Sequence, residues 1–241
     1  LTMTKVNDAE AYAANACLTF DGTVFTGDLK WYADAYSEAD VYAYYPYDAQ
    51  GAPTAYAAVL DQTEGIAQAD FMAASKKGVL PTPNAITMVF KHMMTKLVIN
   101  IDNQSGADVT AVKILGGDAA CDIDIPNLAV LPASGAMPDI LTEITAYEAT
   151  VGKVWQAIVI PQTAKLSVEV SLSSGKKITQ PLAEMTLKSG GQYTINARLL
   201  QDNMIVSASG EIENWTDEGE IGFEGEGTTE DLPVEFTEHE G

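Results

Sequence analysis

Basic residues are scarce in this chain. It has 13 Lys and Arg against 34 Asp and Glu, and Arg198 is its one arginine. The net charge of −21 repels phosphate backbones, which excludes nucleic acid as a partner. The acidic excess is largest at the end, because residues 211–241 contain 12 acidic residues and no Lys or Arg.

Cysteine and histidine are rarer still. Cys17 and Cys121 are too few for a disulfide framework, and the sequence leaves open whether they pair or are two buried thiols. His92 and His239 lie far apart, with no Gly-x-Ser-x-Gly motif and none of the clustered Cys and His ligands that zinc requires. A phosphate-binding glycine loop is also missing. The sequence therefore predicts no enzyme, no cofactor and no metal site.

Long apolar runs are absent as well. No segment reaches the roughly 20 apolar residues of a membrane-spanning helix, and the residues that follow Leu1 do not have the pattern of a signal peptide. Hydrophobic residues nevertheless make up 46% of the chain, which is enough to build a core and excludes disorder throughout.

Apolar and polar residues alternate in short runs that turn residues separate, and this period of two is typical of β-strands. Leu166, Val168 and Val170 share one face of such a strand, and Pro46 ends an aromatic run over residues 39–45. Helix signals are weak. The sequence therefore predicts an all-β fold of antiparallel β-sandwiches.

Turn residues near position 80 divide this pattern, because Gly78, Pro81 and Pro83 interrupt the alternation. We expect an N-terminal sandwich over residues 1–84, a C-terminal sandwich over 85–215 and an acidic, glycine-rich tail over 216–241. The first domain looks short for a sandwich. This predicts that its leading strands lie upstream of Leu1.

Aromatic residues concentrate in the first domain, and they allow two interpretations. Exposed on a sandwich, they would form a surface on which sugars stack. Alternatively, some fill a small core and the others pack over its end, which is the interpretation that we favour. The residues concerned are Trp31, Tyr42, Tyr44, Tyr45 and Tyr47.

Six short motifs occur in an order that resembles the Bacteroidales fimbrillin family, which comprises type V pilins and Mfa-like fimbrillins. None is specific alone, but together they extend from Trp31 to Trp215. They are Trp31 with the strand Ala39-Asp-Val-Tyr-Ala-Tyr-Tyr-Pro-Tyr47, Ala69-Asp-Phe-Met72, Phe90-Lys-His92 before Lys96-Leu-Val-Ile-Asn-Ile101, Ile158-Val-Ile-Pro-Gln162, Gly191-Gln-Tyr-Thr-Ile195, and Ile212-Glu-Asn-Trp215.

The resemblance implies two transthyretin-like β-sandwiches in a protein exported as a lipoprotein through the outer membrane to the cell surface. It also implies that subunits polymerise by strand exchange, after proteolysis removes an N-terminal strand and opens a groove. Two features depart from the family. Cys17 lies within strand-forming sequence and is no lipidation site, and no arginine near the start offers a cleavage point for an arginine-specific protease.

A candidate donor strand follows the acidic segment. Leu232, Val234 and Phe236 alternate with polar residues or proline, as a strand inserted into an open sheet edge requires. The alternative is a disordered acidic tail.

These observations together predict a structural or adhesive subunit of a bacterial surface fimbria. Its partners would be other fimbrial subunits, and a lipid anchor outside this sequence would attach it to the outer membrane. The alternative is a non-polymerising surface adhesin that binds glycans or proteins. The resemblance offers nothing to distinguish stalk, tip and anchor positions.

Overall fold

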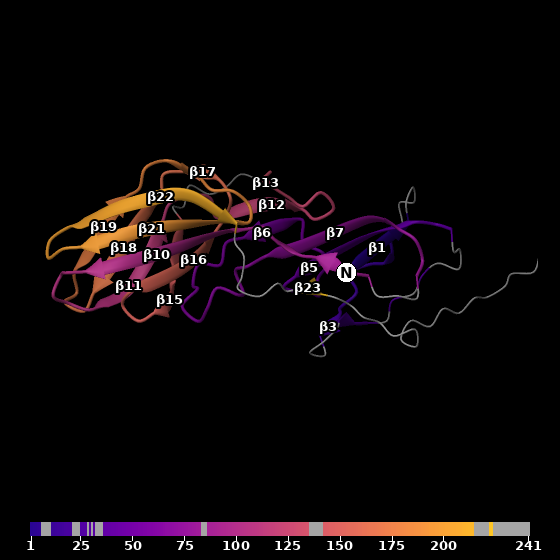
Figure 1. Ribbon diagram of the computed structural model, residues 1–241, viewed down its shortest axis with the longest axis horizontal. Helices are drawn as coiled ribbons and strands as arrows, with labels where there is room; N and C mark the ends of the chain where they lie inside the picture. The colour runs from indigo at the N-terminus through magenta and orange to yellow at the C-terminus, as the bar shows by residue number, and fades with distance from the viewer. Residues whose placement is uncertain are drawn as a thin grey trace, which may run out of the picture.

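The computed structural model describes residues 1–5, 11–20, 25–27, 29, 31, 36–82, 86–134, 142–214 and 222–223. These residues form strands, turns and loops without an α-helix, so no helix among them could cross a membrane. Figure 1 shows an elongated molecule in which two groups of β-sheets lie end to end. The predicted all-β fold is confirmed, whereas the transthyretin-like topology stays a prediction.

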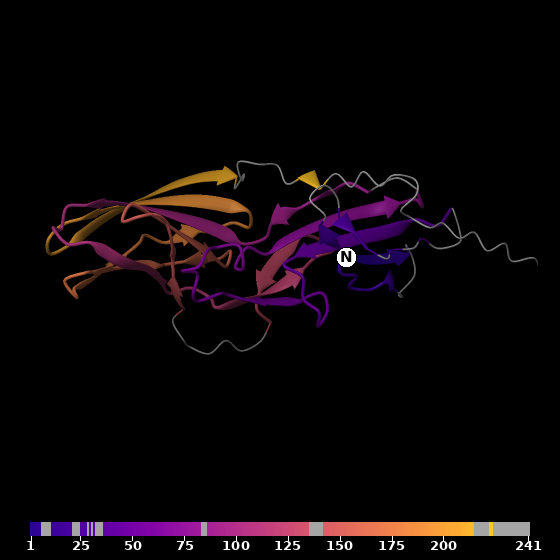
Figure 2. The same ribbon diagram turned by 90° about the horizontal axis from the view of Figure 1, so that it is seen from below.

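The larger group, which we name the second sandwich, consists of two facing sheets (Figure 2). One sheet has the order β15–β16–β10–β21–β22, formed by Tyr147–Thr150, Val154–Val159, Thr95–Asn103, Gly191–Leu199 and Met204–Asn214. The other has the order β14–β11–β18–β19, formed by Glu143–Thr145, Val109–Leu115, Ser167–Leu172 and Lys177–Pro181.

Strict alternation builds the core of the second sandwich. In β10, Leu97, Ile99 and Ile101 point inward and are buried, and Val168 and Val170 of β18 meet them from the facing sheet. One central pairing is parallel, because Ile99 of β10 lies beside Ile195 of β21 in a parallel register. The other strand ladders among the described residues are antiparallel, as predicted.

The smaller group, the first sandwich, also has two sheets. One has the order β2–β1–β5–β7–β9, formed by Ala11–Ala13, Thr2–Lys5, Ala39–Tyr45, Met72–Val79 and Lys91–His92. The other has the order β13–β12–β6, formed by Ala129–Pro132, Ala120–Asp124 and Ala55–Ala57. Tyr44, Phe71 and Ile123 belong to the core between them.

The sheet that contains β5 is buried on both faces. Opposite the core just described, Met3, Val41 and Ala43 form a smaller cluster, against which Trp31 and Phe90 pack. Successive residues of β5 therefore alternate between two interiors. This explains why its sequence is apolar and aromatic almost without interruption.

The two sandwiches share buried residues at their junction. Met93 and Met94, between β9 and β10, are fully buried in the core of the first sandwich, together with Ile158 of β16. The buried side chain of Gln62 accepts the N–H of Ile158 (2.8 Å) and donates to its carbonyl (2.9 Å). Strand β16 contributes side chains to both cores, and it thus fixes the second sandwich to the first.

Segments beyond residue 84 contribute to the first sandwich. β9 pairs with β7, and β12 pairs with β6, although more than 60 residues separate the latter two. The division into 1–84 and 85–215 stays a prediction. Three two-stranded ribbons complete the described structure: β3–β4 (Thr19–Phe20 and Phe25–Thr26), β8–β23 (Met88–Val89 and Gly222–Phe223) and β17–β20 (Thr163–Ala164 and Met185–Thr186).

Candidate functional site

Strand β1 lies between β2 and β5 in the first sandwich and forms the candidate site for strand exchange. It pairs antiparallel with β5, with Met3 opposite Val41 and Thr4 opposite Asp40. Met3 is 3% exposed and packs in the cluster that contains Val41 and Ala43. A four-residue strand thus covers one edge of the central strand.

Few groups fix the start of β1. The Leu1 amino group donates to the carbonyl of Ala16 (2.7 Å), and the Asn15 N–H donates to Thr2 Oγ1 (3.2 Å). Burial lowers the pKa of the Leu1 amino group, although Cys17 acts in the opposite direction. Among the described side chains of β1, Met3 alone is fully buried. Because apolar burial is small, we expect β1 to be held weakly.

The predicted aromatic residues occupy different environments. Tyr44 is buried, stacks on Phe71 with ring centroids 6.1 Å apart, and its hydroxyl lies 2.6 Å from Asn15 Oδ1. Tyr42 is half-buried against the same core and donates to Asp40 Oδ2 (3.1 Å). Trp31 packs on the opposite face and donates from Nε1 to the Thr82 carbonyl (2.9 Å).

Tyr45 and Tyr47 differ from these three because they reach solvent. They are 43% and 45% exposed and flank Pro46, whose peptide bond with Tyr45 is cis. β5 ends at Tyr45, so both rings lie at one end of the first sandwich. Their use as a sugar-stacking surface stays a prediction.

Asp70 and His92 form a largely buried hydrogen-bonded pair. His92 Nδ1 lies 2.9 Å from both carboxylate oxygens of Asp70, and the side chains are 13% and 11% exposed, respectively. The pair joins two motifs that are separate in the sequence, at the point where β9 pairs with β7. His92 thus links two segments of the fold.

Gln162 and Tyr193, which belong to two further motifs, form hydrogen bonds with backbone groups. The Gln162 side-chain oxygen accepts the N–H of Asp118 (2.7 Å), which fixes the loop after β11. The Tyr193 hydroxyl donates to the Thr186 carbonyl (2.8 Å) and accepts the N–H of Lys188 (3.1 Å). These side chains stabilise loops and are already engaged in intramolecular bonds.

The cysteines are free thiols, Cys17 exposed and Cys121 buried. Burial, with the nearby carboxylates of Asp122 and Asp118, raises the pKa of Cys121 to about 12. Within the described ranges, no three His, Cys, Asp or Glu side chains gather as metal ligands would. The candidate donor residues Leu232, Val234 and Phe236 lie outside the described residues.

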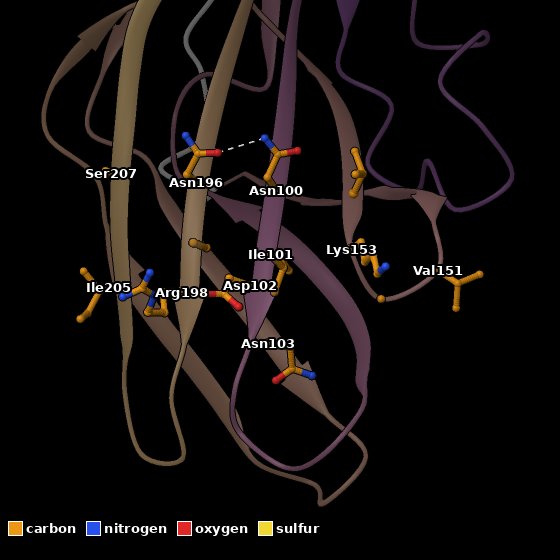
Figure 3. Close-up of a pocket in the computed structure, with 13 residues that line it drawn as sticks. Asn100, Ile101, Asp102, Asn103, Val151, Lys153, Asn196, Arg198, Ile205 and Ser207 are labelled. Atoms are coloured by element: carbon orange, nitrogen blue, oxygen red, sulfur yellow. Dashed lines mark hydrogen bonds and ion pairs between the residues drawn. The ribbon is translucent and has the colours of Figure 1, made fainter.

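Our sequence predictions missed two features. The first is the position of Met3 beside β5, which the alternation within a short first strand could have suggested. The second is a polar hollow on the outer face of the second sandwich, lined by Asn100 and Asn196 (Figure 3). The signal was available, because both strands carry polar residues at every second position towards their ends.

Comparison with solved structures shows the same fold. A candidate cell adhesion protein from Bacteroides uniformis aligns with a TM-score of 0.64 at 20% identity, over 89% of this chain and 91% of that one. A second from Bacteroides ovatus gives 0.63 at 23% identity, over 81% and 76%. The tip fimbrial protein Mfa3 from Porphyromonas gingivalis, with a C-terminal truncation, gives 0.53 at 9% identity, over 89% and 92%.

No curated protein sequence matches the chain. A family model does, and it is described as fimbrillin-like. It covers residues 1–215, and so includes both sandwiches and all six motifs from Trp31 to Trp215. The chain therefore belongs to the fimbrillin-like family.

Proposed function

We propose that the chain is a structural or adhesive subunit of a bacterial surface fimbria, and that it assembles by exchanging strand β1 for a strand of a neighbouring subunit. The observation that carries this proposal is that β1, a four-residue strand beside the central strand β5, buries only one of its described side chains. Family membership supports a fimbrial role. The proposal includes export as a lipoprotein and assigns the chain no catalytic activity.

The predicted donor strand would bury more apolar side chains beside β5 than β1 does. Leu232, Val234 and Phe236 would point to one face, where Met3 now contacts Val41 and Ala43. Each buried apolar side chain contributes about 1.5–3 kcal/mol before ordering costs, so three would outweigh the single methionine. Exchange would then be favourable once β1 leaves.

A reversible lock on β1 tests this proposal. Thr4 and Asp40 lie directly opposite each other, where Cα atoms of antiparallel pairs are about 4.5–5.5 Å apart and suit a disulfide. In a Cys17→Ser background, Thr4→Cys with Asp40→Cys should stop polymerisation when oxidised and permit it when reduced. Electron microscopy of surface fimbriae measures the outcome, with Asp40→Cys alone as the control. Equal polymerisation in both redox states would refute exchange of β1.

The donor strand needs its own experiment. Deletion of Thr229 to Gly241, or serine at Leu232, Val234 and Phe236, should abolish polymers. Glu235→Gln with Thr237→Ser changes the alternate positions and should leave assembly intact. Polymers that survive the deletion would remove the donor role from this tail, while leaving the exchange of β1 open to the disulfide test.

A second candidate function is a non-polymerising adhesin that binds glycans through exposed tyrosines. The exposure of Tyr45 and Tyr47 at one end of the first sandwich favours it. On a glycan array, binding that disappears in the Tyr45→Ala, Tyr47→Ala variant would support this function. Binding that survives both substitutions would refute it.

A further inference from the structure

An open hollow of about 770 Å³ lies on the outer face of the second sandwich (Figure 3). β10, β21 and β22 form its floor, and the turn over residues 151–154 forms one wall. Val151 and Ile205, at the rim, are 84% and 57% exposed. The hollow therefore has polar side chains at its centre, whereas apolar atoms make up much of its walls and rim.

Two asparagine side chains meet at its centre. Asn100 Nδ2 donates to Asn196 Oδ1 (3.0 Å), since the two residues are directly paired across β10 and β21. This bond leaves Asn100 Oδ1 and Asn196 Nδ2 without a hydrogen-bond partner in the described part of the chain. The pair therefore offers one acceptor and one donor to a ligand.

The hollow is lined by two positively charged side chains, Lys153 and Arg198, and one negatively charged side chain, Asp102, whereas acidic residues outnumber basic ones in the chain as a whole. Arg198 Nε donates to Asp102 Oδ2 (3.0 Å), which leaves the two terminal nitrogens of the guanidinium for another acceptor. Lys153 forms no ion pair with any described residue. The nearby Glu148 carboxylate accepts the N–H of Gly152 (2.7 Å), so one of its oxygens is already engaged by the backbone.

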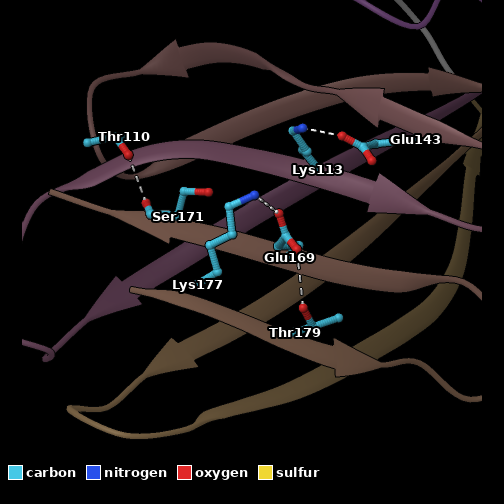
Figure 4. Close-up of polar contacts among 7 residues, drawn as sticks. All are labelled: Thr110, Lys113, Glu143, Glu169, Ser171, Lys177 and Thr179. Atoms are coloured by element: carbon cyan, nitrogen blue, oxygen red, sulfur yellow. Dashed lines mark hydrogen bonds and ion pairs between the residues drawn. The ribbon is translucent and has the colours of Figure 1, made fainter. Parts of the chain in front are cut away.

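The opposite outer face of the same sandwich is different (Figure 4). There Lys113 pairs with Glu143, and Lys177 Nζ lies 3.1 Å from Glu169 Oε1. Each of these lysines has a carboxylate partner, as is typical of a hydrated strand face. The unpaired Lys153 and the partly engaged Arg198 distinguish the hollow from that face and make it complementary to an anion.

The polar lining favours a sugar over a peptide. Backbone groups of β10 and β21 are already paired on both sides, so a peptide could not extend the sheet here. The Asn100–Asn196 amide pair also lies where an apolar pocket would be needed to anchor a peptide side chain. Amides, a hydroxyl at Ser207 and cations are instead groups that bind sugar hydroxyls and carboxylates.

We propose that this hollow binds acidic glycans, with a sugar carboxylate on Arg198 or on Lys153, which lie on opposite sides of the hollow, and sugar hydroxyls on the Asn100–Asn196 pair (Figure 3). The inference rests on the proposed adhesive role of the subunit, but it does not depend on polymerisation. Because exposed charges contribute to it, binding weakens as the salt concentration rises.

NMR titration of the full-length protein tests the site directly. The probes are 3′-sialyllactose and tri-galacturonic acid, with lactose as the neutral counterpart and a hexaglutamate peptide as the non-sugar anion. We expect at least one acidic sugar to bind with a dissociation constant of about 1 mM or tighter. Since Arg198 is the one arginine, its Nε–H signal reports on the hollow alone.

Substitutions provide matched controls. Lys153→Gln and Arg198→Gln should each weaken binding about tenfold, because each removes a charge-assisted hydrogen bond. Asp102→Asn should strengthen sugar binding, because the ligand carboxylate then no longer competes with the Asp102 carboxylate for Arg198. Lys177→Gln makes the same charge change on the opposite face and should have no effect.

Three outcomes would overturn the inference: neither acidic sugar shifts the Arg198 signal, lactose binds as tightly as 3′-sialyllactose, or hexaglutamate binds as tightly as the sugars. Electron microscopy of the Lys153→Gln and Arg198→Gln variants separates this result from the proposed function. Intact fimbriae with no sugar binding would refute the glycan site alone. Sugar binding by a protein that forms no fimbriae would refute strand-exchange assembly alone.

Discussion

The two sandwiches fill their interiors with different side chains. The second uses mainly Val, Ile and Leu on long strands, such as β10 with 9 residues and β22 with 11. The first combines isoleucine with Met, Ala and aromatic residues, and its strands β1 and β2 have only 4 and 3 residues. Branched aliphatic side chains fix a core by close packing, whereas methionine adapts to neighbours of different shape.

This difference suggests a division of roles. A subunit that loses one strand and accepts another needs one interior that tolerates replacement and one that does not change. The first sandwich has the adaptable side chains around the strand proposed for exchange, and the second supplies a rigid body. Substitutions in the two interiors should therefore differ in how much they lower the free energy of unfolding and in how much of the molecule they affect.

The largest effect is expected in the core of the second sandwich. Ile99 is fully buried beside Ile195, so Ile99→Ala should lower the free energy of unfolding by about 4 kcal/mol through lost burial and a cavity. Urea denaturation measures this change. Val98, the next residue on the same strand, is only half-buried on the outer face. Val98→Ala should cost less than about 1 kcal/mol. A similar loss of unfolding free energy in the Ile99→Ala and Val98→Ala variants would contradict a rigid core.

The next largest effect is expected at the Asp70–His92 pair, because its two hydrogen-bonded side chains are nearly buried. Asp70→Ala removes the carboxylate that binds His92 Nδ1 in a nearly buried site, and should cost about 2–3 kcal/mol through the lost hydrogen bond. The exposed Asp102–Arg198 pair is the control, and Asp102→Ala should cost less than about 0.5 kcal/mol. A double-mutant cycle with His92→Ala that gave no coupling energy would show that the pair does not link β7 to β9.

A smaller and local effect is expected at β1. Met3→Ala removes the one fully buried side chain described in that strand and should cost about 2 kcal/mol. Hydrogen exchange should accelerate in β1 and β2 and stay unchanged in β10 and β21. Uniform acceleration through both sandwiches would instead show that β1 unfolds only with the whole molecule.

Much of this architecture follows from local pattern. The alternation of Leu166, Val168 and Val170 predicted a strand with these residues on one face, and all three are buried. Pro46 predicted the end of β5. Pairing over long distances did not follow, because nothing near Ala55 indicates that β6 pairs with β12. The same holds for the parallel register of β10 and β21 and for the presence of Lys153 and Arg198 in one hollow. These depend on tertiary contacts between residues far apart in the sequence.

The smallest expected effect is on alkaline stability, and it also separates the two interiors. Burial, with the hydrogen bond to Asp40, raises the pKa of Tyr42 to about 12, and burial likewise raises the pKa of Tyr56. Both side chains pack on the core of the first sandwich, as does the Cys121 thiol. Between the ordinary tyrosine pKa of about 10 and the raised value, the folded state keeps a proton that the unfolded state loses.

The stability that comes from this difference is therefore complete below about pH 10 and is lost as the pH rises through about 12. Urea denaturation measures the free energy of unfolding at about pH 8 and about pH 11. Between these two values it should decrease less for Tyr42→Phe than for the wild type, because phenylalanine cannot ionise. Tyr45→Phe, at an exposed position of the same strand, should lose as much unfolding free energy between the two pH values as the wild type does. An equal decrease in all three proteins would mean that the core around Tyr42 does not resist ionisation, and the first sandwich would then be less enclosed than its packing indicates.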